Sequence, residues 1–145
     1  MTFQRGFTMF EVVLSAAFVL VLIQIISVFG VRAIFLQEVD EAREQLRSEL
    51  VYSRDQAMAN TASSTWGVAV DGNTLYQFKG SDYATRDPEF DKVYEYGNTL
   101  QFSGDSEIVF EPPFGDVRAT GTIIISNGVT HATATVNPYG MIYIE

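Results

Sequence analysis

Few residues in this chain of 145 could do chemistry. It has one histidine, His131, and no cysteine, which excludes disulfides, thiolate metal sites and a cysteine nucleophile. His131 lies in a Thr- and Ala-rich run, where we expect a solvent-facing strand residue rather than a metal ligand. The sequence contains no Ser-His-Asp set, phosphate loop or nucleotide fingerprint. We therefore predict a protein that is not an enzyme and has no metal or cofactor.

Carboxylates gather in one stretch, DYATRDPEFDK, at residues 82–92. Oxygen-rich loops bind calcium, but this spacing matches no EF-hand, and Asp-Pro is a common turn element. We predict a solvated loop and leave calcium binding open. The carboxylates concerned are Asp82, Asp87, Glu89 and Asp91.

A second stretch, FEPPFGD at residues 110–116, sets two aromatic side chains beside two prolines. It could form a contact surface for another subunit or cap the core, and we favour the cap.

Charge is unevenly distributed along the chain. From Ala59 to the end there are eleven acidic residues and four basic ones, a net charge of −7. Such a domain repels phosphate backbones, so direct nucleic-acid binding is not expected.

One acidic residue, Glu11, stands directly before a run of 20 uncharged residues, 12–31. That length suffices for a helix to cross about 30 Å of hydrocarbon. Placing a carboxylate in or near hydrocarbon costs free energy. The alternative is that Glu11 lies at the membrane interface, where its carboxylate is simply solvated. Arg5 precedes the run and acids follow it, which places the N-terminus in the cytoplasm and the rest outside. The run is too long for a secretory signal peptide, and no small-residue cleavage site closes it.

The stretch RGFTMFE and the apolar run together resemble the signal of type IV pilins and type II secretion pseudopilins. The resemblance implies that a prepilin peptidase cuts between Gly6 and Phe7, that the new N-terminal Phe7 is N-methylated, and that Glu11 serves assembly. There Glu11 would face the Phe7 amine of a neighbouring subunit, which removes most of the cost of burying its charge. The implied partners are the peptidase, other pilin or pseudopilin subunits, an inner-membrane assembly platform and membrane lipid.

The helical pattern continues after the apolar run. Apolar positions recur every three or four residues between Val31 and Ala57, with charged residues on the other faces. No proline interrupts residues 12–58, so we predict one helix of about fifty residues, with Gly30 as a soft point. Two separate helices are the alternative.

After a polar linker the sequence is typical of short strands joined by turns. DGN at 71–73 and NG at 127–128 predict hairpins, and NPYG at 137–140 predicts a further turn. The expected fold class is α+β: a long N-terminal helix, half transmembrane and half amphipathic, packed on a mainly antiparallel β-sheet. The predicted strands are 66–70, 75–79, 92–96, 100–103, 107–110, 122–126, 129–136 and 141–144.

The layout after the helix is similar to that of the GspH/FimT-type minor pseudopilins. Some members of that group bind DNA through a basic C-terminal region, whereas residues 119–145 contain no Lys or Arg, which argues against DNA binding. The resemblance implies a minor, structural subunit of a pilus, secretion or DNA-uptake filament, anchored by one pass in the inner membrane before assembly. An uncleaved, membrane-anchored binding module is the alternative. The predicted segments are a leader (1–6), a membrane and assembly half-helix (7–31), an amphipathic half-helix (32–60) and a β-rich domain (61–145).

Overall fold

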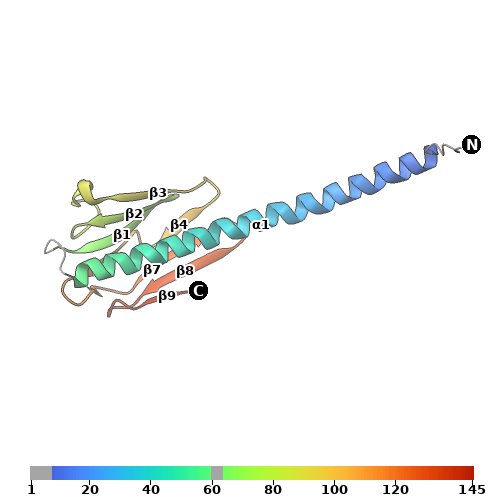
Figure 1. The fold of residues 1–145 in the computed structure, drawn as a ribbon. Helices are drawn as coiled ribbons and strands as arrows, with labels where there is room; N and C mark the ends of the chain where they lie inside the picture. Colours follow the sequence, from blue (N-terminus) through green and yellow to red (C-terminus); the bar gives the residue numbers. More distant parts are fainter. Residues whose placement is uncertain (1–7, 60–63) are drawn as a thin grey trace, which may run out of the picture. The chain divides into compact units, whose positions relative to one another are not determined.

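The computed structural model describes residues 8–59 and 64–145, with the side chains of 27–35 left out of the description. The chain divides into two compact units, Met1–Ile34 and Phe35–Glu145. Helix α1 (Met9–Met58, 50 residues) belongs to both units (Figure 1). A single helix of this length confirms the sequence prediction.

The part of α1 in the second unit buries one stripe of its surface. The stripe contains Val39, Ala42, Leu46, Leu50 and Ala57, all fully buried or nearly so. Their spacing of three or four residues, with Ser53 completing the row, places them on one face of an α-helix. Most charged side chains between them are partly or fully exposed, and Glu49 is the buried exception. Packing of the apolar face holds the helix on the domain.

After α1, the described residues 64–145 contain nine strands, which form two antiparallel sheets rather than the single sheet that we expected. One sheet has the order β3-β2-β1-β5-β6 and the other the order β4-β7-β8-β9. The alternation of side chains along a strand predicts strand pairing, but it does not say where one sheet stops and another begins. The strands are β1 (Trp66–Asp71), β2 (Thr74–Lys79), β3 (Lys92–Glu95), β4 (Gln101–Gly104), β5 (Glu107–Glu111), β6 (Asp116–Val117), β7 (Gly121–Ser126), β8 (His131–Val136) and β9 (Ile142–Ile144).

Most predicted strands begin and end within one residue of the observed ones, and two differences are larger. Strand β8 begins at His131, two residues later than predicted, because the Asn127 side chain accepts hydrogen bonds from the backbone N–H groups of Val129 and Thr130 (both 3.1 Å). These bonds hold residues 127–130 as a turn. Strand β6 was not predicted, since two residues carry no periodic signal.

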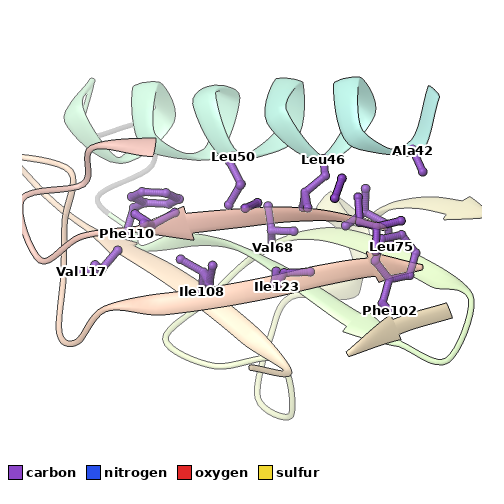
Figure 2. Packing of buried hydrophobic residues seen from close by; sticks show 14 of the residues in the cluster. Ala42, Leu46, Leu50, Val68, Leu75, Phe102, Ile108, Phe110, Val117 and Ile123 are labelled. Atoms are coloured by element: carbon purple, nitrogen blue, oxygen red, sulfur yellow. The ribbon is translucent and has the colours of Figure 1, made fainter. Parts of the chain in front are cut away.

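One hydrophobic core joins the helix to both sheets. Figure 2 shows Leu46 and Leu50 of α1 pointing at Val68, Phe110 and Ile123, which come from different sheets. The fold is therefore α+β, with the helix packed on antiparallel sheets, as predicted.

Candidate functional site

The predicted cleavage site cannot be placed, because Gly6 and Phe7 lie outside the described residues. The description begins at Thr8, and Glu11 lies in the first turn of α1 with an exposed side chain. Glu11, the third residue of the predicted site, therefore lies at the start of the helix.

The start of α1 has a local structure that sequence reasoning missed. The Glu11 backbone N–H donates a hydrogen bond to Thr8 Oγ1 (3.2 Å), so Thr8 acts as the N-cap of the helix. Thr-x-x-Glu is the sequence of a capping box, and this was the signal that could have revealed it. A carboxylate in the first turn also interacts favourably with the helix dipole. Glu11 thus has a role within its own chain, in addition to any role between chains.

The helix of the first unit exposes apolar side chains in every direction. All side chains described from Thr8 to Ile26 are exposed, and Met9–Ile26 has a mean hydropathy of 2.5. Ser15, one of the few polar members, donates its hydroxyl hydrogen to the Glu11 carbonyl (2.7 Å). By length and composition this is one helix that could cross a membrane. Water is a poor solvent for such a surface, and the surface is consistent with a place in a membrane or against other apolar helices.

In the second unit, a buried carboxylate that the sequence did not reveal holds strand β3 to α1. Glu49 is only 4% exposed, and its Oε1 accepts hydrogen bonds from Gln45 Nε2 (2.9 Å) and from the Tyr94 hydroxyl (2.8 Å). Its Oε2 lies 3.9 Å from Lys92 Nζ, which also sits over the Tyr52 ring. Buried charges are retained only when they are paired and hydrogen-bonded in this way.

Two tyrosines beside this carboxylate have raised pKa values. Burial, followed by the hydrogen bond to Glu49, raises the pKa of Tyr94 to about 12. Burial, followed by the charges of nearby carboxylates such as Glu41, raises the pKa of Tyr96 to about 12. Both hydroxyls are therefore neutral at physiological pH, and the Tyr94 hydroxyl donates its hydrogen to Glu49.

The carboxylates of residues 82–92 make separate local contacts. Asp82 accepts hydrogen bonds from Thr85, which lower the pKa of its carboxyl group. Asp91 pairs with Arg86 at 2.7 Å, and Asp87 caps the 3-10 helix η2 (Pro88–Phe90). Among the described residues, no group of three or more potential ligands is arranged to hold a metal ion.

The two aromatics of FEPPFGD have opposite environments. Phe110 is fully buried in the core, whereas Phe114 is 73% exposed. The capping prediction therefore holds for the first aromatic and is wrong for the second. His131 is exposed on β8, as predicted.

A long N-terminal helix packed by its second half on antiparallel sheets is a pilin-like fold. The solved structure of the minor pseudopilin EpsH from the type 2 secretion system of Vibrio cholerae is similar to this chain, with a TM-score of 0.57 and 12% sequence identity. The match covers 74% of this chain and 96% of that one. No protein-family model and no curated protein matches the sequence. The chain therefore has the fold of a minor pseudopilin, as the sequence resemblance predicted.

Proposed function

We propose that this chain is a structural subunit of a pseudopilus or related type IV filament. It would be made as a precursor, cut after Gly6 and assembled through α1. The observation that carries the proposal is a helix whose first half is apolar on every face and whose second half packs on a pilin-like domain. Such a helix needs apolar surroundings, and a membrane supplies them before assembly and neighbouring helices supply them afterwards.

Glu11 is the proposed assembly residue. Cleavage after Gly6 would leave a positively charged amine on Phe7, four residues before Glu11 in the chain. When helices pack together, the exposed Glu11 carboxylate of one subunit would pair with that amine of the next. Pairing lowers the cost of placing a charge among apolar helices, and it favours one register over others. The proposed partners are therefore other subunits of this type, the prepilin peptidase, the assembly platform and lipid.

The test is the intact mass and N-terminal sequence of the protein isolated from membranes of cells that have an active prepilin peptidase. We expect a chain that begins at N-methylated Phe7. The matched variant Gly6→Ala should stay at full length, because a Cβ obstructs close approach of the peptidase to the backbone. A wild-type chain that begins at Met1 would overturn the proposal in favour of an uncleaved membrane-anchored module.

A second variant separates processing from assembly. Glu11→Ala should still be cleaved, because the apolar run is intact, but it should enter sheared filaments poorly. Ser15→Ala is the control, since it removes a polar group one helical turn away without removing the charge. Normal incorporation of Glu11→Ala would exclude the pairing role.

A further inference from the structure

One end of the domain carries a surface with an unpaired cation among exposed apolar side chains. We call it the Arg54 patch; it consists of Arg54, Met58, Phe114 and Tyr139. Phe114 and Tyr139 are each 73% exposed, and Met58 is 44% exposed. Exposed aromatic side chains beside an arginine are typical of protein interfaces.

The patch is held in shape by two glycines. Gly115 (φ +69°) packs against α1, where a Cβ would lie 2.8 Å from Arg54 Cγ. Gly140 (φ +71°) lies against the carbonyl of Gly115, and a Cβ there would lie 2.9 Å from Arg54 Nε. The turns FEPPFGD and NPYG are therefore stacked on each other and on the helix. Phe114 and Tyr139, which precede these glycines, are presented on ordered turns, which lowers the entropy cost of docking.

Arg54 differs from most basic side chains of the domain. Arg43, Arg86, Lys92 and Arg118 each pair with a carboxylate. Within the described part of the chain, Arg54 has no ion-pair partner, and its buried Nε has no hydrogen-bond acceptor. Because the Arg54 guanidinium has no carboxylate beside it in the described residues, a partner that brings a carboxylate to the patch would gain a charge-assisted hydrogen bond.

The chain also carries a surface that complements this patch. We call it the Glu41 cleft; it has a volume of about 540 Å³ and lies between α1 and the segment 93–97. Glu41 and Glu95 line it, and neither has an ion-pair partner among the described residues. Val93, 56% exposed, adds an apolar wall. The cleft thus offers carboxylates and apolar surface, where the patch offers a cation and apolar side chains.

We propose that the Arg54 patch of one subunit docks in the Glu41 cleft of a second copy of this chain. Arg54 and Glu41 are 13 residues apart along α1, about 20 Å of helix, near opposite ends of the buried stripe that packs on the sheets. A contact between different surfaces of identical subunits is heterologous, and it continues as a filament if it does not close into a ring. The contact also places the unpaired Arg54 guanidinium against the carboxylates of the second copy. Without such pairing, the net negative charge of the domain keeps copies apart. The inference rests on the proposed filament role, and it adds a contact between domains.

The chain has no cysteine, so introduced cysteines can report the contact without background. Two differently tagged full-length copies, Phe114→Cys and Val93→Cys, are expressed together, and their membranes are oxidised with copper-phenanthroline. We expect a disulfide-linked dimer with both tags, about tenfold more abundant than with the control pair Phe114→Cys and Glu89→Cys. Glu89 is exposed in η2, whose Phe90 packs against Trp66 at the start of β1 and so lies at the same end as the patch.

Charge reversal then tests the chemistry of the contact. Arg54→Glu in the Phe114→Cys copy should lower the dimer yield about tenfold, and Glu41→Arg in the Val93→Cys copy should restore it. The buried, single Trp66 reports whether each variant is folded. If Arg54→Glu does not fold, Glu41→Arg alone should lower the yield at an exposed position.

Three results would overturn the contact: equal yields for the control pair, no restoration by the charge swap, or cross-linking of Phe114→Cys to a different protein only. The mass of the same samples reports leader cleavage separately. A chain that begins at Phe7 but forms no dimer contradicts the contact alone, and one that begins at Met1 contradicts the proposed function.

Discussion

The two halves of α1 have the same backbone conformation but need opposite surroundings. In the first unit, the side chains of Met9–Ile26 are exposed on all faces and almost all are apolar. In the second unit, one stripe of the helix is buried in the domain and the other faces carry charge. Helix formation alone therefore tells little about function. What separates the two halves is whether the chain itself covers the apolar surface of the helix.

The difference between the two halves is tested most strongly by truncating the same residue type in each half. Leu50→Ala should lower the free energy of unfolding of the domain by about 2–5 kcal/mol, because it leaves a cavity under α1. Leu20→Ala should change it by less than about 0.5 kcal/mol. Urea unfolding of the full chain in mild detergent, followed by Trp66 fluorescence, measures both. Equal effects of the two substitutions would show that the first half of the helix also supports the domain.

A second prediction concerns the buried Glu49 network, which only the second half of the helix has. Because the pKa of Tyr94 is raised to about 12 from its ordinary value of 10.0, its stabilising contribution is present below pH 10. It is lost as the pH rises toward 12. Tyr94→Phe should lower stability at pH 7 by about 1–3 kcal/mol, since Glu49 loses a donor. Between pH 10 and 12, the Tyr94→Phe variant should lose less additional stability than the unmodified protein.

The measurement is urea unfolding at a series of pH values, again through Trp66. Tyr139→Phe is the control, because that hydroxyl is on an exposed side chain. An alkaline loss of stability in Tyr94→Phe as large as in the unmodified protein would contradict the role assigned to Tyr94.

The smallest effect is expected at the helix start, where the first half depends on a local cap instead of a core. Thr8→Ala should weaken the first turn by about 1 kcal/mol, because the Glu11 N–H loses its acceptor. Hydrogen exchange of the Glu11 amide in detergent micelles should speed up about fivefold, while the amides near Leu50 keep their rates. Unchanged exchange at Glu11 would mean that the cap contributes nothing.

Much of this fold could be predicted from the sequence, for identifiable reasons. The helix was predictable because an uninterrupted 3.6-residue period and the absence of proline are local signals. The hairpin at Gly72 was predictable because a two-residue turn between β1 and β2 favours positive φ at that glycine. The features that were missed include the division into two sheets and the buried Glu49. Each depends on residues far apart in the chain, as the 45-residue separation of Glu49 and Tyr94 shows.

The functional residues also divide into those that the sequence predicted and those that it did not. Gly6, Phe7 and Glu11 were identified from a short motif and its neighbouring apolar run, because processing and membrane insertion depend on local sequence. They remain predictions. The Arg54 patch could not be identified, because Arg54, Phe114 and Tyr139 are brought together only by the packing of two turns against α1.

By itself, the sequence determined the helix, the membrane-length apolar segment, most strands and the acidic character of the domain. All of these depend on residue types at short spacing, which act through local backbone preference and hydration. The tertiary structure alone shows that the strands form two sheets and that Phe110 is buried while Phe114 is exposed. It also shows that Glu49 has a hydrogen-bond donor and a cation from strand β3 beside it, whereas Arg54 has no ion-pair partner among the described residues. The physical reason is that burial and hydrogen-bond satisfaction are set by side chains from distant segments, whose meeting no local pattern encodes.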